Sequence, residues 1–243
     1  MNALIISESR KLATLRSTRY TLAVAPILSA VVAVVAVHLL PETDNLVVTE
    51  VARGTAEPMW FVVSVIAILA GAGEFQHRTI LTTLLAAPHR TTVLAAKAVV
   101  IAAYGAVLTA VGMGAAVAAS LLTAQFTGVP VQAGDATSWA GIAGAVVVGA
   151  MFGMLASALG MLTRSTAFAL TALLLWRFVG EGMLPVVLNR PAISDWTPSG
   201  AARALVGSMN QTIGAAGAGL LLVGYVTLVA AAAVWTFHHR DPA

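Results

Sequence analysis

Long apolar segments separated by short polar breaks constrain this chain more than any other feature. An α-helix needs about 20 mainly apolar residues to cross the roughly 30 Å hydrocarbon layer of a bilayer. Of the 243 residues, 59% are apolar and 9% are charged. The apolar segments cover residues 20–40, 58–73, 92–122, 138–162, 167–188 and 213–237. The sequence therefore predicts an all-α integral membrane protein whose six transmembrane helices form a single domain, residues 1–243.

The charged residues divide unevenly between the two sides of a six-span topology. The side with both termini carries Arg10, Lys11, Arg16, Arg19, Arg78, Arg90, Lys97, Arg164 and Arg240 against Glu8, Glu74 and Asp241. The opposite side carries Arg53, Arg177, Arg190 and Arg203 against Glu42, Asp44, Glu50, Glu57, Asp135, Glu181 and Asp195. Cytoplasmic loops are enriched in Lys and Arg. We therefore expect both termini to be cytoplasmic, and the basic pI to reflect topology and the lipid bilayer rather than nucleic acid.

Residues 1–19 are predicted to form an amphipathic helix in the cytoplasmic membrane interface. Leu4, Ile5, Leu12 and Leu15 fall within one arc of this helix, with basic residues mostly flanking it. Anchoring to lipid alone accounts for such a helix. Glu8 falls inside the apolar arc, however, where a carboxylate facing acyl chains is costly. We therefore expect Glu8 to meet a protein donor, most simply Arg78 or Arg90.

The loop between the second and third spans, residues 74–91, contains a short helix with one apolar face. At a spacing of four residues, the segment "TILTTLLAA" stacks two pairs, Ile80 over Leu84 and Leu81 over Leu85. Both signs of charge surround this face, at Glu74, His77, Arg78 and Arg90. The pattern favours a protein docking surface over a helix that lies on the membrane. A metal site is not favoured, because an E-x-x-H spacing without a second histidine lacks ligands for zinc.

The fifth span is interrupted near its outer end. Arg177 and Glu181 lie one helical turn apart, and the polar tract 189–212 that follows is too polar to cross. Glycine and proline there can return the chain as a re-entrant outer hairpin if protein or a watery cavity surrounds it. We consider two roles for the pair: pinning the broken helix to the hairpin, or lining a translocation path or outer gate.

Two further features bear on helix packing. The second span is short, so it is predicted to extend outward through residues 55–57 or to bury its inner end in protein. The fourth span carries a small-residue stripe, Gly141, Ala145, Gly149, Gly153 and Ser157, and the third carries Ala102, Ala106, Ala110, Gly114 and Ala118. Such stripes let helices approach closely. Packing within the chain is favoured over a dimer seam for both.

The order of three passages resembles the permease subunits of ABC-2 type ATP-binding-cassette exporters, in their short six-span actinobacterial-like form. The passages are "SESRKLATLRSTRY", "GEFQHRTILTTLLAAPHRTTVLAAK" and "GMLTRSTAFAL". The resemblance implies that the 74–91 loop holds a coupling helix seated in a cleft of the ATPase. It also implies a bacterial plasma membrane, two copies of a separate ATPase subunit, and a second permease subunit, either a second copy or a sister permease.

No "GxxxxGK[ST]" phosphate-binding motif occurs in the chain. We therefore expect no catalytic residues and no bound cofactor or metal, with ATP and Mg²⁺ on the partner ATPase. The expected function is export of a hydrophobic or amphiphilic substrate, drug-like or lipid-like. The alternative is a secondary transporter or channel acting without an ATPase. An intramembrane enzyme is disfavoured. The spans lack a glycine-flanked serine with a partnered histidine, an HExxH motif, and paired aspartates at matching depth.

Overall fold

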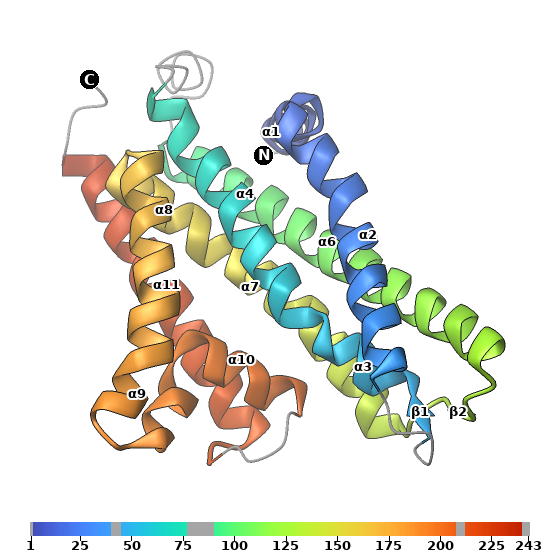
Figure 1. Cartoon of the computed structure of the whole chain (residues 1–243). Coiled ribbons are helices and arrows are strands. Elements are labelled where there is room, and N and C mark those ends of the chain that lie inside the picture. The colour runs from blue at the N-terminus through green and yellow to red at the C-terminus, as the bar shows by residue number, and fades with distance from the viewer. Residues whose placement is uncertain (1, 40–44, 77–89, 208–211, 240–243) are drawn as a thin grey trace.

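The computed structural model describes residues 2–39, 45–76, 90–207 and 212–239 and is almost entirely helical (Figure 1). The main helices of the six apolar segments are α2 (Arg16–His38), α4 (Ala56–Gln76), α6 (Arg90–Thr127), α7 (Ala136–Thr163), α8 (Thr166–Leu175) and α11 (Ala215–His239). The shorter elements are α1 (Asn2–Thr14), α3 (Val48–Gly54), η1 (Trp176–Met183), α9 (Leu184–Val187), η2 (Pro191–Trp196) and α10 (Pro198–Val206). A two-residue parallel strand pair, β1 (Leu46–Val47) with β2 (Val131–Gln132), is a small exception to the all-α prediction.

Six helical segments of the described chain are long and apolar enough to cross a membrane. They are Arg16–His38, Val48–Gln76, Thr91–Thr127, Ala136–Thr163, Thr166–Val187 and Ala215–Phe237. The second segment was predicted to begin at residue 58. Because α4 begins at Ala56 and follows α3 closely, the predicted outward extension is confirmed. At 1.5 Å per residue, the 21 residues of α4 span roughly 31 Å, enough to cross the hydrocarbon layer.

Helix α7 lies at the centre of the bundle and packs against α4, α6 and α11. Its small residues allow close backbone approach. A side chain at Gly149 would overlap Thr109 and the carbonyl of Gly105 on α6. The carbonyl of Ser157 similarly occupies the space above Gly71 on α4. The stripe on the fourth span therefore packs within the chain, as predicted.

The corresponding prediction for α6 is only partly right. The α6 face that meets α7 carries Ile101, Gly105 and Thr109, whereas Ala110 and Gly114 of the predicted stripe are exposed. The reason is that α6 packs against both α2 and α7, so two neighbouring helices together decide which of its faces is buried. Residue size alone did not distinguish these faces.

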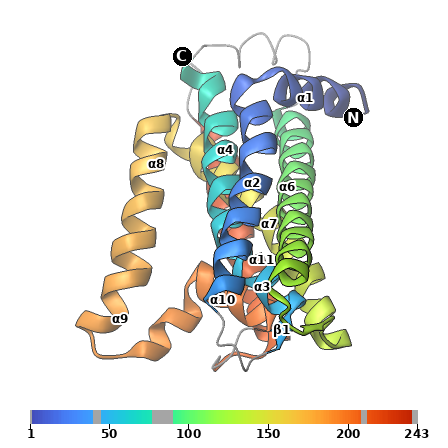
Figure 2. The same cartoon turned by 45° about the vertical axis from the view of Figure 1, so that its right-hand side comes forward.

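The fifth segment is broken, as the sequence indicates, but the break is a π-helix rather than a loop. Helix α8 widens into η1 at Trp176, continues into α9, and returns through η2 and α10. Residues of α10 are mostly buried against α7 and α11. Figure 2 shows α8 and α9 standing beside the main group of helices, joined to it through α10. Helix α1 and the C-terminal ends of α4 and α11 share one end of the bundle, and α3, α9 and α10 share the other (Figure 1).

Candidate functional site

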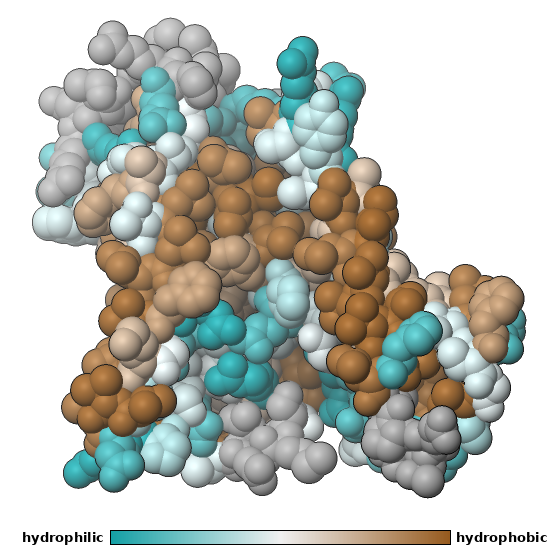
Figure 3. Space-filling model, in the orientation of Figure 1, coloured by the Kyte–Doolittle hydropathy of each residue, from teal (hydrophilic) through white to brown (hydrophobic). Residues whose placement is uncertain are grey.

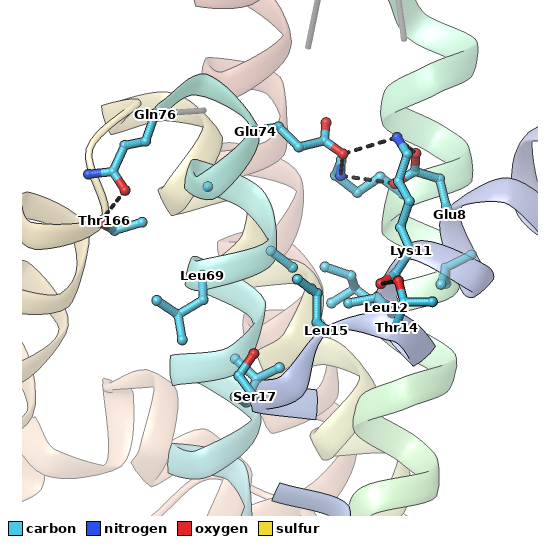
Figure 4. Close-up of a pocket in the computed structure, with 16 residues that line it drawn as sticks. Glu8, Lys11, Leu12, Thr14, Leu15, Ser17, Leu69, Glu74, Gln76 and Thr166 are labelled. Carbon is cyan, nitrogen blue, oxygen red and sulfur yellow. Dashed lines mark hydrogen bonds and ion pairs between the residues drawn. The ribbon is translucent and has the colours of Figure 1, made fainter. Parts of the chain in front are cut away.

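Four charged side chains, all but Lys11 largely buried, form a cluster at the α1 end of the bundle, which we call the inner cluster: Glu8, Lys11, Glu74 and Lys97 (Figure 4). Lys11 Nζ lies 2.6 Å from Glu8 Oε1 and 3.2 Å from Glu74 Oε1. Lys97 Nζ lies 3.0 Å from Glu8 Oε2 and 3.0 Å from Glu74 Oε1. Each lysine therefore bridges both carboxylates, and the four charges cancel.

The inner cluster is built from three elements. Glu8 and Lys11 lie one turn apart on α1, Glu74 lies in the last turn of α4, and Lys97 lies two turns into α6. Glu8 and Lys97 are each only 4% exposed. Because paired charges tolerate burial far better than single ones, the two lysines explain how a carboxylate fits the apolar side of α1.

The pKa of Glu8 reflects two opposing effects. Burial raises this pKa, but the charges and hydrogen bonds of Lys97 and Lys11 lower it further than burial raises it, so the net shift is downward from 4.5. For Lys11, burial lowers the pKa, whereas Glu8 and Glu74 raise it, and the net shift is upward from 10.5. Both shifts favour the charged forms, so α1 is held by ion pairs across the neutral pH range.

Acidification should release α1 from the bundle. A lowered pKa at Glu8 means that its stabilising contribution is complete above pH 4.5 and is lost as the pH falls through the folded-state value. The raised pKa of Lys11 gives a contribution that is complete below 10.5 and is lost only above that value. We expect a nitroxide at Ser9→Cys on α1 to gain mobility below pH 4.5 and to stay unchanged from pH 5 to 9. Equal mobility at pH 7 and pH 3 would contradict this. The Glu8→Gln variant, which lacks the titrating group, serves as the control.

The inner cluster joins the chain on either side of residues 77–89. Glu74 precedes these residues, Lys97 follows them, and both contact α1. The predicted residues His77, Arg78, Ile80, Leu81, Leu84 and Leu85 lie outside the described residues, as does the side chain of Arg90, the first residue of α6. Gln76 accepts a hydrogen bond from Thr166 at 2.8 Å, which links the end of α4 to the start of α8.

The expectation that Glu8 meets a protein donor is confirmed. Its two oxygens bind Lys11 and Lys97, two residues that the sequence analysis did not propose as partners. The available signal was Lys97 itself, a single lysine inside the apolar run "VLAAKAVVIAAY". A charge in such a run is costly unless it is paired, so Lys97 called for a carboxylate partner.

A second charged group, the outer cluster, lies at the opposite end of the bundle and consists of Glu57, Arg177, Glu181 and Arg203. Arg177 donates to Glu57 and, from Nη1, to Glu181 Oε2 at 3.2 Å. Arg203 of α10 donates to the same Glu57 oxygen at 3.2 Å. The predicted Arg177–Glu181 pair is therefore formed, and it extends to residues in the first turn of α4 and in α10.

Glu181 has further donors besides Arg177. Trp176 Nε1 donates to Glu181 Oε1 at 3.1 Å, and the backbone N–H of Ser199 donates to the same oxygen at 3.2 Å. Ser199 lies in the first turn of α10, where unpaired backbone N–H groups and the helix dipole favour a negative charge. Glu181 thus joins η1 to α10, and the widened π-helix places its side chain there.

A cavity of about 340 Å³ lies beside the outer cluster, between α4, α7, α8, η1, α10 and α11. Aromatic side chains supply much of its lining: Trp60, Phe61, Phe152, Trp176 and Tyr225. The side chains of Glu57, Arg177 and Arg203 are each about one third exposed. Figure 3 shows hydrophilic surface recessed between apolar columns in this half of the molecule. The cavity is therefore apolar along its walls and charged at one end.

Across the described part of the chain, no group of three or more His, Cys, Asp or Glu residues gathers as a metal site requires. The six apolar helices and their two charged clusters define the architecture of a multi-pass helical membrane protein. No family model matches the chain, and no curated protein matches it in sequence.

Proposed function

We propose that this chain is the membrane-spanning permease subunit of an ATP-binding-cassette exporter. The inner cluster supports this proposal, because it fastens the chain on either side of residues 77–89, the predicted coupling loop, to α1. A loop that receives force from a cytoplasmic partner must be rigidly joined to the spanning helices if its displacement is to move them. The four ion pairs of the inner cluster, which involve α1, α4 and α6, provide such a rigid connection.

The aromatic cavity is the proposed path of the substrate. Its apolar walls suit a hydrophobic or amphiphilic drug-like or lipid-like molecule, and its volume lies within the range of small-molecule pockets. Arg177, Glu57 and Glu181 of the outer cluster line its charged end. In this proposal η1 to α10 form a re-entrant outer hairpin, and the buried packing of α10 supports that assignment.

The proposed complex contains two copies of a separate ATPase, which binds ATP and Mg²⁺, and a second permease subunit, either a second copy or a sister. It lies in a bacterial plasma membrane with both termini cytoplasmic. The common end shared by α1 and the end of α11 supports an even number of crossings (Figure 1).

A carboxylate on the apolar face of the predicted coupling helix should abolish ATPase binding. Burying a charge in an apolar protein contact costs several kcal/mol. We expect Leu81→Asp and Leu84→Asp to lose co-purification of the proposed ATPase subunit when the two are co-expressed. Thr83→Asp, which places the same charge on another face of the helix, should retain it. Undiminished co-purification and transport by the leucine variants would contradict the proposed docking.

A secondary transporter acting without an ATPase is the second candidate. The outer cluster favours it, since charged side chains from α4, η1 and α10 gather at a cavity between spanning helices. Export by the purified chain in vesicles with an ion gradient and no ATPase would select this candidate. ATP-dependent export that requires the partner would exclude it.

A further inference from the structure

A second and larger cavity, of about 630 Å³, lies beside the inner cluster between α1, the start of α2, α4, α6 and the start of α8. In Figure 4, Glu74, Lys11 and Glu8 lie near the end of α4, whereas Leu69 and Leu15 lie further along α4 from that end. The cavity therefore has a charged end and an apolar end. The apolar part is lined by Leu12, Leu15, Ile66, Leu69, Ala70, Val100 and Ile101.

The exposed charge in this cavity is positive. The Lys11 side chain is 42% exposed, whereas those of Glu74, Glu8 and Lys97 are 12%, 5% and 5% exposed. The inner cluster is neutral as a whole, but its most exposed member is Lys11, so this ammonium is the charged group most open to a ligand in the cavity. The ion pairs with Glu8 and Glu74 raise the pKa of Lys11 and keep it charged.

The surroundings of Lys11 add to this positive potential. Arg10, Arg16 and Arg19 are exposed on α1 and the first turn of α2. Glu8 is the only acidic residue before Glu42, and it is buried. A basic surface next to a membrane attracts anionic lipid headgroups.

We propose that this cavity binds an anionic amphiphile from the membrane leaflet on the α1 side. The headgroup contacts Lys11 at the charged end, and the chain lies along Leu69 and Leu15. From Ile66 to Glu74 the α4 wall rises roughly 12 Å, which matches a ligand with a polar end and an extended apolar part. Lipid binding at this site requires that the bundle lie in a membrane, but it does not require the proposed ATPase. A failure of lipid binding can therefore be distinguished from a failure of the proposed exporter function.

The absence of cysteine makes the test direct. Ser17→Cys is labelled with a fluorophore, and the full chain is placed in phosphatidylcholine nanodiscs. One set of nanodiscs contains a small fraction of phosphatidylglycerol with a nitroxide on one acyl chain. The other set contains the same fraction of phosphatidylcholine labelled in the same way. We expect phosphatidylglycerol to quench the Ser17 label at least threefold more than phosphatidylcholine. A label at Trp235→Cys, exposed on α11 away from the cavity, should be quenched equally by both.

Three variants separate a site from general attraction to a basic surface. Lys11→Gln should remove the preference for phosphatidylglycerol, and Arg10→Gln, which removes an equal charge outside the cavity, should retain it. Because Lys11 also belongs to the inner cluster, Leu69→Trp provides a variant that fills the cavity without changing any charge. It should reduce quenching by phosphatidylglycerol to the phosphatidylcholine level. Equal quenching by both lipids in the parent, or a preference that survives both Lys11→Gln and Leu69→Trp, would overturn the proposal.

Discussion

Replacing Lys97 with methionine should destabilise the protein more than any other single change in the inner cluster. Removing one partner of a buried ion pair costs about 3–5 kcal/mol, because the remaining charge is left in a low-dielectric environment. Lys97 is 4% exposed and supplies the bond to Glu8 Oε2 at 3.0 Å. We therefore expect a large fall in the temperature of unfolding in detergent and a lower yield of folded protein.

A second substitution tests whether the loss comes from unbalanced charge. In Lys97→Met combined with Glu8→Gln, Lys11 and Glu74 keep their pair, at 3.2 Å, and no excess carboxylate is buried. This double variant should recover at least half of the lost unfolding temperature. Arg10→Met, on the exposed face of α1, should change stability little. An unfolding temperature in Lys97→Met equal to that of the parent would refute the role of the cluster.

Glu181→Leu should destabilise the outer half of the bundle. The substitution leaves Trp176 Nε1 and the Ser199 N–H without their acceptor and removes one partner of Arg177. Hydrogen bonds to a charged group are worth about 1.5–3 kcal/mol, and a buried donor without a partner costs a similar amount. We therefore expect a loss of about 3 kcal/mol or more, measured as unfolding of the purified chain.

Glu181→Gln is the matched comparison, because its amide oxygen can still accept from α10. It should lose much less stability than Glu181→Leu. Arg190→Leu, an exposed position between α9 and η2, controls for the loss of a charge at this end. Equal unfolding temperatures in Glu181→Leu and Glu181→Gln would exclude the pinning role of the carboxylate.

The two roles considered for Arg177 and Glu181 can then be assigned to different residues. Glu181 is buried and joins η1 to α10, whereas Arg177 is one third exposed beside the aromatic cavity. The neutral pair Arg177→Met with Glu181→Gln removes both charges while roughly keeping their volume. A lower unfolding temperature or impaired assembly of this variant would favour the pinning role. Normal assembly without substrate stimulation of ATP hydrolysis would favour a path or gate.

Several features of the fold could be predicted from the sequence because they depend on local composition. Apolar segments of membrane-crossing length predicted the six helices, and a cluster of glycine, proline and charge predicted the interruption after Trp176. The position of Glu8 within an apolar arc predicted a protein donor. Each inference used residues within one helical segment, where spacing along the chain determines spacing in space.

The identities of the partners from other helices depended on the tertiary structure. Glu8 and Lys97 are 89 positions apart, and Arg177 and Glu57 are 120 positions apart. Nothing in local spacing selects Lys97 over Arg78 or Arg90, or adds Glu57 and Arg203 to the outer pair. Likewise, the buried face of α6 followed from its contacts with both α2 and α7. Helix formation in a membrane is fixed by hydrogen bonds within each segment, whereas the pairing of charges is fixed by how the helices pack.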